Sequence, residues 1–443
     1  MNEIGVQTTG ERGSALVLAI FAIFLLAAMG ITLLFLADSD VKMNQAGLRA
    51  KKSFYLAEAG LEEARKALRA ANVASSNPAG LSDELVVAAG TGSPSAIEAD
   101  PTTIAPVYNS AGIATSFTGY GNDVPLVANT ALGTGRYTAF LTNDAVDGWA
   151  TKTDTNDRVM ITAIGAGADR SVEMVQAIVE ITELPALPAT VTMLGPAPST
   201  FVGGNSSSKI YSGNDCVGAT GYTGVANLHM PVVGTMNSAS QASVAASVTA
   251  DDATYQSTPE SGANTVDDSS TTSDPRWTVT ADPMWNDCQA VKALAASVKS
   301  AADYICTSSQ PCSHWGTSTT STVTYAEGNL NPGTGKGLLW VTGTLTINGA
   351  TSWEGTIYVV GTGQFLRSGG GSGHTWGGIM VGDIAGPDNV FGTADDCTGP
   401  SAGFSAASFD TSGGGGHQTI YCSDIINKTN AGLPIAIEEF RQR

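Results

Sequence analysis

A run of 24 uncharged residues, from Ser14 to Ala37, constrains this chain more than any other feature. Only the short polar leader 1–13 precedes the run, and Asp38 is the first charge after it. A secretory signal has a shorter apolar core followed by a cleavage site, and a buried helix of a soluble protein rarely runs this long without a charge. About 20 apolar residues suffice to cross a bilayer. Residues 14–37 are therefore predicted to form a transmembrane helix that stays on the protein.

The apolar helix is expected to continue into water as an amphipathic helix that ends near residue 72. The apolar residues that recur at the spacing of one helix face are Phe54, Ala57, Leu61, Ala64 and Leu68. Charged residues take the opposite face, and Pro78 cannot continue a helix. The predicted helix, 14–72, would be about 80 Å long.

The order of leader, apolar run and helix tail resembles the N-terminal region of type IV prepilins. The segment RGSALVLAIFAIFLLAAMGITLLFLADSDVKMNQAGLRAKKSFYLAEAGLEEA looks most like that of PilX-type minor pilins, through Arg12-Gly13 and the AGLEEA stretch near the helix end. The resemblance implies that a prepilin peptidase cuts after Gly13 and leaves Ser14 as the new N-terminus. It also implies an inner-membrane anchor before assembly and contacts with other pilins through the helix afterwards.

Two positions depart from the pattern of major pilins, which have phenylalanine after the cut and glutamate at the fifth position. Ser14 and Leu18 occupy those places here. By the resemblance, the glutamate pairs with the N-terminus of a neighbouring subunit. A chain with Leu18 is therefore expected at the filament tip, where no subunit lies ahead of it.

The charge distribution places the acidity outside the membrane. The formal net charge is −19, and residues 73–443 hold 13 bases against 33 acids. Nucleic-acid binding needs a basic surface, so no nucleic-acid partner is expected. Few charges and abundant Gly, Ser and Thr favour turn-rich β structure, and 443 residues allow about two or three domains.

The fold class predicted is α+β, with a small pilin-like sheet in residues 73–185. Three β-rich runs, GRYTAFLTND, DRVMITAIGAG and RSVEMVQAIVEIT, are separated by turn-forming residues. Runs of this kind predict an antiparallel meander, and a helix on such a sheet is also what the resemblance implies. The prolines of ELPALPA then indicate a linker, after which residues 186–443 form a β-rich outer domain.

The outer domain is predicted to be a β-solenoid with a polar insertion and a helix around 220–330. A short strand pair is expected in STFVGGNSSSKIYSGND, a surface insertion over 235–275, and a helix with Val291, Leu294, Ala295 and Val298 on one face. Trp340, Tyr358 and Met380 then occupy comparable places in glycine-bounded strands. Such spacing is typical of stacked rungs, and a β-sandwich is the alternative that stays open.

Six cysteines in the outer half predict disulfides, because their number is even and the chain is expected to be exported. They are Cys216, Cys288, Cys306, Cys312, Cys397 and Cys422. Fifteen pairings are possible; Cys306–Cys312 and Cys397–Cys422 are the two proposed. A zinc site is the rival interpretation, but CxxC is absent.

No catalytic residue is predicted. The acids of the rung region form no close pair, and His374 and His417 lie in glycine-rich stretches, which hold a catalytic base poorly. The loop GPDNVFGTADDC offers Asp388, Asn389, Asp395 and Asp396, and oxygen ligands of this kind suit Ca²⁺. A Ca²⁺ site and a solvated acidic turn both stay open; no other cofactor is expected.

These features together predict a structural minor pilin of a type IV pilus or a related periplasmic pseudopilus, acting at the tip in filament initiation or surface adhesion. The alternative is a membrane-anchored adhesin outside any filament. An anchored carbohydrate-active β-helix enzyme is the third class and the least favoured.

Overall fold

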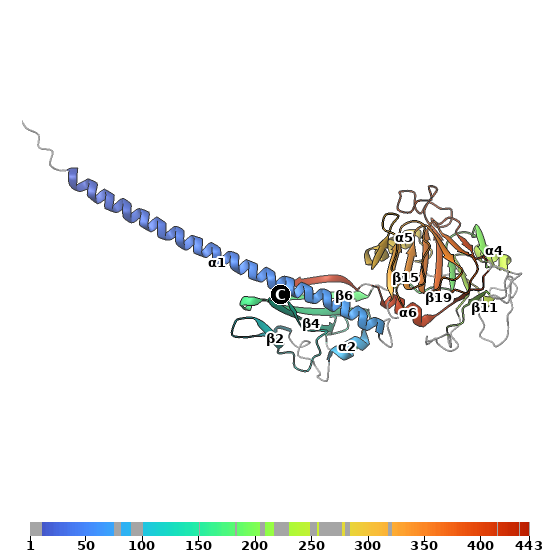
Figure 1. The fold of residues 1–443 in the computed structure, drawn as a ribbon, viewed down its shortest axis with the longest axis horizontal. Helices are drawn as coiled ribbons and strands as arrows, with labels where there is room; N and C mark the ends of the chain where they lie inside the picture. Colours follow the sequence, from blue (N-terminus) through green and yellow to red (C-terminus); the bar gives the residue numbers. More distant parts are fainter. Residues whose placement is uncertain are drawn as a thin grey trace, which may run out of the picture.

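The computed structural model describes residues 11–442 apart from 75–80, 90–100, 150, 182–183, 204–208, 217–229, 249–254, 257–276, 280–283, 318–320, 414 and 434. A long helix leads to a small helix–sheet domain and then to a larger β-rich domain (Figure 1). We call residues 51–181 together with 435–442 the head domain, and residues 184–433 the outer domain.

Helix α1 (Glu11–Ala74) is 64 residues long and confirms the predicted helix, which it extends by three residues at the start. Its N-terminal part, from Leu16 to Lys52, is exposed along its whole length. By length and composition this helix can cross a membrane. Leucine, isoleucine and phenylalanine side chains here are mostly more than half exposed. A water-exposed apolar surface of this size needs a cover, which a bilayer or other helices would supply.

The C-terminal part of α1 packs on a five-stranded antiparallel sheet with the order β22-β6-β5-β4-β3. The strands are β3 (Val127–Leu132), β4 (Gly135–Asn143), β5 (Arg158–Ala166), β6 (Val172–Ile181) and β22 (Ile435–Gln442). Strands β4, β5 and β6 form the predicted meander in full register. Smaller elements complete the head domain: α2 (Ser82–Ala89), η1 (Pro101–Thr103), β1 (Ala105–Tyr108), β2 (Ala114–Thr118) and η2 (Ala168–Arg170).

The predicted apolar face of α1 is the face that the sheet buries. Ala57, Leu61, Ala64 and Leu68 are at most 2 % exposed, and Phe54 packs partly against the same core. The helix also approaches β5 closely, since a Cβ added at Gly165 would lie 2.2 Å from the Ser53 carbonyl oxygen. A larger residue at Gly165 would therefore push the helix off the sheet.

Strand β22 corrects the predicted domain boundary. Residues 435–442, assigned from the sequence to the outer domain, pair antiparallel with β6, and Ile435 lies opposite Ile181. The outer domain is thus inserted between two adjacent strands of the head sheet. The sequence gives little sign of this, because β22 is a mostly exposed strand in which only Ile435 is buried.

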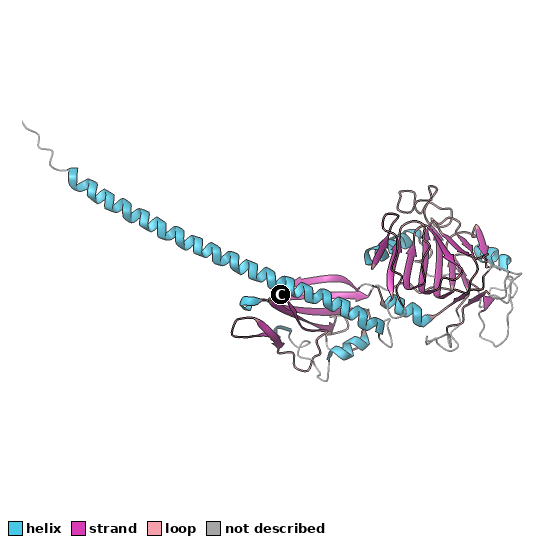
Figure 2. Ribbon diagram, in the orientation of Figure 1, coloured by secondary structure: helices cyan, strands magenta, loops and turns pink. Residues whose placement is uncertain are grey.

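Among its described residues, the outer domain contains an 11-stranded and a 4-stranded sheet. Figure 2 draws the strands of this domain in magenta. The larger sheet holds β7 (Val191–Met193), β9 (Ile210–Ser212), β10 (Val233–Thr235), β11 (Tyr255–Gln256), β12 (Trp277–Val279), β13 (Tyr304–Cys306), β14 (Thr322–Ala326), β15 (Gly335–Val341), β17 (Trp353–Gly361), β19 (His374–Asp383) and β21 (Gln418–Ile420). The smaller sheet holds β8 (Thr200–Val202), β16 (Thr344–Asn348), β18 (Gln364–Ser368) and β20 (Ser408–Asp410).

All strand pairs of these two sheets are parallel among the described residues. From β15 to β21 the chain alternates between the larger and the smaller sheet. Trp340, Tyr358 and Met380 lie in one row across neighbouring strands, which confirms their predicted equivalence. Parallel pairing differs from the antiparallel pairing of an immunoglobulin-type sandwich.

Two apolar layers hold the outer domain together. Inward side chains such as Leu345, Ile357 and Phe365 fill the space between the sheets. On the opposite face of the larger sheet, Trp340 and Tyr358 pack with residues of α5 (Cys288–Ala301). Helix α5 confirms the predicted helix, since Val291, Leu294, Ala295 and Val298 are its buried residues together with Cys288.

Two expectations for the earlier part of the outer domain are corrected. Strands β8 and β9, expected as a pair, belong to different sheets: β8 pairs with β20, and β9 lies between β11 and β21. The polar stretch 235–275 contains a helix, α4 (Ser238–Val248), with Val244 buried. Much of the remaining stretch lies outside the described residues. Helix α6 (Ser423–Ala431) then returns the chain toward the head domain.

The six cysteines form three disulfides, Cys216–Cys422, Cys288–Cys397 and Cys306–Cys312. The local pair Cys306–Cys312 was predicted, whereas the proposed pair Cys397–Cys422 is wrong. Parallel stacking brings β9 beside β21, so that Cys216 reaches Cys422 after these strands. The α5 helix, packed over the sheet, carries Cys288 to Cys397. The zinc interpretation fails because each sulfur is bridged.

A cleft at the strand ends of the outer domain

A cleft of about 650 Å³ lies in the outer domain where successive parallel strands end. Its floor consists of the turns that follow β14, β15 and β17, and the loop after β19 forms one wall. Helix α5 forms the other wall. The cleft residues are Lys292, Ala296, Lys299, Tyr325, Glu327, Gly328, Asn329, Thr342, Gly343, Thr362, Asn389, Val390, Phe391 and Gly392.

Hydrogen bonds between successive turns fix the floor. The Thr342 N–H donates to the Ala326 carbonyl at 3.0 Å, and the Thr362 N–H donates to the Thr342 carbonyl at 2.9 Å. Gly343 stacks so closely on the turn below that an added Cβ would lie 2.3 Å from the Gly328 carbonyl carbon. Glycine is therefore required where the two turns meet.

Helix α5 is held in place at its start. The Asp287 side chain caps the helix by accepting from the Gln289 and Ala290 N–H groups. The Cys288–Cys397 disulfide ties the first turn of α5 to the loop of the opposite wall. With the buried face of α5 on the sheet, Lys292, Ala296 and Lys299 are left along the cleft.

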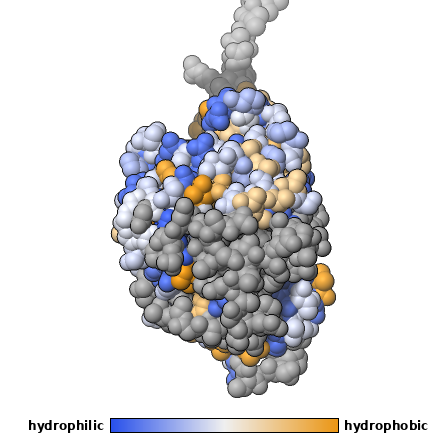
Figure 3. Space-filling model, turned by 90° about the vertical axis from the view of Figure 1, so that its right-hand side faces the viewer, coloured by the Kyte–Doolittle hydropathy of each residue, from blue (hydrophilic) through white to orange (hydrophobic). Residues whose placement is uncertain are grey.

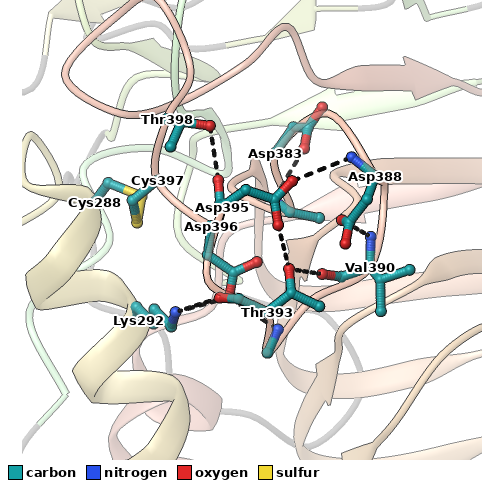
Figure 4. A network of polar contacts seen from close by, with 12 residues as sticks. Cys288, Lys292, Asp383, Asp388, Val390, Thr393, Asp395, Asp396, Cys397 and Thr398 are labelled. Carbon is teal, nitrogen blue, oxygen red and sulfur yellow. Dashed lines mark hydrogen bonds and ion pairs between the residues drawn. A yellow bond between two sulfur atoms is a disulfide. The ribbon is translucent and has the colours of Figure 1, made fainter.

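The acidic loop after β19 is held by an internal network (Figure 4). Asp396 Oδ2 accepts from the Gly392 N–H at 2.8 Å and pairs with Lys292 Nζ at 2.8 Å. Asp395 Oδ1 accepts from the Thr393 hydroxyl at 2.5 Å. Asp388 Oδ1 accepts from the Val390 N–H. The carboxylates thus shape the loop that presents Val390 and Phe391 to the cleft.

The four residues predicted as Ca²⁺ ligands lie on this loop, but their ligand atoms do not form one compact group. Asn389 is exposed, whereas the Asp396 side chain is fully buried against Lys292. Among the described residues, one group of three potential ligands converges, Asp215 with Cys216 and Cys422, and its two cysteines are bridged. Ca²⁺ binding by Asp388, Asn389, Asp395 and Asp396 stays a prediction.

The charges of the cleft are paired. Lys299 Nζ lies 2.5 Å from Glu327 Oε1 and 6.0 Å from the centre of the Tyr325 ring. Burial raises the pKa of Tyr325, and the Glu327 charge raises it further. Below the loop, burial raises the pKa of Asp383 to about 6, against the opposing hydrogen bond from the Ala385 N–H. The cleft therefore combines apolar walls with polar groups and carries no large excess of either charge.

The two histidines weighed as catalytic bases are more rigid than the glycine-rich sequence suggested. His417 is 4 % exposed and its Nε2 lies 2.8 Å from the Tyr211 hydroxyl. Burial, with Arg367 and Lys209 nearby, lowers the pKa of His417 to about 3. His374 begins β19, where its Nδ1 lies 3.2 Å from Ser352 Oγ and burial lowers its pKa. The His374 N–H also donates to Ser352 Oγ, so His374 contacts this hydroxyl through both its ring and its backbone.

The residues predicted for processing lie at the start of the chain. Gly13 and Ser14 are in the first turns of α1, and residues 1–10 of the leader lie outside the described part. Sequence reasoning missed the cleft altogether. The signals in the sequence were the glycines and threonines that follow β14, β15 and β17, and only the parallel register stacks their turns into a floor.

At the end of the outer domain remote from α1, the visible described side chains are mostly hydrophilic, with scattered hydrophobic ones (Figure 3). The described part of that face thus presents no single broad apolar patch.

Comparison with known proteins gave no match to any family model, curated protein or solved structure.

Proposed function

We propose that this protein is a minor pilin of a type IV pilus or a related pseudopilus. Its N-terminal helix would anchor it in the inner membrane until prepilin peptidase cuts after Gly13, and would then join other pilins in a filament. Its outer domain would act at the tip, in initiation or adhesion. No catalytic step is part of this proposal.

The division of α1 into two halves supports this proposal most strongly. One continuous helix carries an exposed part, which contains the uncharged run, and a part that is buried on an antiparallel sheet. A simple membrane anchor needs only the first half. The resemblance to prepilins implies such a continuous helix, preceded by a leader that ends in Arg12-Gly13.

Because the outer domain is inserted between β6 and β22, the head domain can carry it as a separate module. Both connections leave from the same end of the head sheet, since Ile181 and Ile435 are partners. We take the stacked parallel strands as a short β-solenoid, because the chain alternates between two parallel sheets in a constant register. This arrangement would keep the cleft away from the helix half that enters the membrane or filament.

N-terminal sequencing of the membrane-extracted protein tests the processing step. In cells with active prepilin peptidase we expect the mature chain to start at Ser14. Gly13→Val should leave the leader attached, whereas the matched change Gly10→Val in the same leader should not. A wild-type chain that still began at Met1 would contradict the proposal.

Immunogold labelling against the outer domain separates filament from anchor. We expect sparse label at one end of each filament. Label along the shaft would reject the tip position. If the leader were retained and filaments carried no label, the alternative of a membrane-anchored adhesin would be favoured.

A further inference from the structure

We infer that the cleft between α5 and the strand-end turns binds a neutral oligosaccharide. The inference rests on the proposed function in one respect, namely that the outer domain faces the outside of the cell. The chemistry of the cleft itself does not depend on the proposed function.

The shape of the cleft suits a short chain of repeating units. Its lining follows the ends of four neighbouring strands, β14, β15, β17 and β19. Adjacent strands lie about 4.8 Å apart, so the row spans about 14 Å. A pyranose unit in a glycan advances by a length similar to one strand spacing. A row of stacked turns can therefore meet successive sugar units with similar groups.

The charges argue for a ligand without charge. Lys292 is paired with the buried Asp396, and Lys299 is paired with Glu327. An acidic polymer would have to displace these carboxylates or leave its own charges poorly paired. A neutral ligand can instead hydrogen-bond to the pairs without breaking them.

The walls offer the mixed surface that a sugar ring needs. Val390 is 53 % exposed and stands beside Phe391 on the loop wall, opposite Ala296 of α5. A pyranose has faces of C–H groups that pack on apolar side chains, and hydroxyl groups at its rim. Apolar walls with a few placed polar groups are typical of small-molecule sites.

One hydroxyl on the floor, that of the half-buried Thr362, has no partner of its own, and a rotation of this side chain toward the cleft would let a ligand supply one. The Thr362 Oγ1 atom is buried and has no hydrogen-bond partner among the described residues. At the equivalent place in the turn below, Thr342 Oγ1 accepts from the Gly328 N–H at 2.9 Å. Asn329 Oδ1 accepts from the Thr344 N–H. This bond orients the Asn329 side-chain amide, whose Nδ2 can donate to a ligand.

An extended peptide fits less well. Peptides commonly add as a strand to an open sheet edge. Here the N–H groups of Thr342, Gly343 and Thr362 already donate to the preceding turns. The floor consequently lacks a free row of backbone donors, whereas side-chain hydroxyl and amide groups remain for sugar hydroxyls.

Isothermal titration calorimetry on the full-length chain tests the inference, in a detergent whose headgroup is not a sugar. The probes are maltohexaose, cellohexaose and N-acetylated chitohexaose, with hexagalacturonate as the acidic comparison. We expect at least one neutral probe to bind and hexagalacturonate to bind at least tenfold more weakly.

Two variants locate the site. Phe391→Ala should weaken binding at least tenfold, while Tyr304→Ala, at an exposed aromatic residue outside the cleft, should leave it unchanged. Thr362→Val removes an unpartnered hydroxyl at nearly constant shape, so thermal stability should hold while affinity falls about fivefold or more. This combination distinguishes a ligand contact from a folding defect.

Failure of all three neutral probes to bind, tighter binding of hexagalacturonate, or unchanged affinity in Thr362→Val would each overturn the inference. Cleavage after Gly13 is measured separately. A processed chain that binds no glycan would reject the sugar site and leave the pilin proposal standing, and an unprocessed chain that binds glycan would do the reverse.

Discussion

The head domain and the outer domain bury the apolar faces of their sheets in different ways. In the head domain, α1 lies across five antiparallel strands, and four of these strands follow one another in the chain. In the outer domain every described strand pair of the two sheets is parallel. Two neighbouring parallel strands need a crossover connection, so other residues always lie between them in the chain.

The difference shows what each domain depends on. The head domain depends on one helix face, whose small and leucine side chains let α1 approach the sheet closely. The outer domain depends on long-range closure, and all three disulfides belong to it. One described contact between the two domains is an ion pair, in which Arg69 Nη1 of α1 lies 3.0 Å from Asp303 Oδ1.

The largest effect is expected from removing the longest disulfide loop. Replacing Cys216 and Cys422 by serine should lower the free energy of unfolding of the outer domain by about 5 kcal/mol, because the loop spans 206 residues. The same change at Cys306 and Cys312, six residues apart, should cost about 2 kcal/mol. Denaturant unfolding followed by tryptophan fluorescence measures both, since six of the seven tryptophans follow residue 184. Equal losses would contradict the dependence on long-range closure.

A smaller loss, confined to the head domain, is expected from Leu61→Asp. Leu61 is 2 % exposed under the sheet, and burying a carboxyl there should cost about 3–5 kcal/mol. Leu48→Asp, at a position that is 53 % exposed, is the matched control and should change stability by less than about 0.5 kcal/mol. Hydrogen exchange of the β4–β6 amides reports the head domain directly. Unchanged protection in Leu61→Asp would show that this face does not hold the sheet.

The smallest effect on the head domain is expected from removing the outer domain. Ile181 and Ile435 lie opposite each other, so residues 182–434 should be replaceable by a short Asn-Gly turn that joins β6 to β22 as a hairpin. Exchange protection of β4–β6 should persist. A second version that ends at residue 181, without β22, serves as the control and should lose protection in β6. If the short-turn chain failed to fold, the outer domain would be part of the head's core rather than an insertion.

Features with a local period were predictable from the sequence. The uncharged run predicts the exposed half of α1, and the 3.6-residue pattern predicts the buried face that contains Leu61. Alternation predicts β4, β5 and β6, and the helical spacing of the apolar residues from Val291 to Val298 predicts α5. The comparable places of Trp340, Tyr358 and Met380 also follow from the sequence, because each lies in a short strand bounded by glycine.

Only the tertiary structure decided which distant segments meet. The return of β22 to β6, the pairing of Cys216 with Cys422 and the cleft beneath Val390 and Phe391 all join residues far apart in the chain. A local pattern fixes which face of an element is apolar, since that depends on neighbours a few residues away. It does not fix the partner, because the entropy of closing a long loop changes only slowly with its length and many partners cost nearly the same. The choice among them is made by packing and by register, which exist only once the strands have stacked.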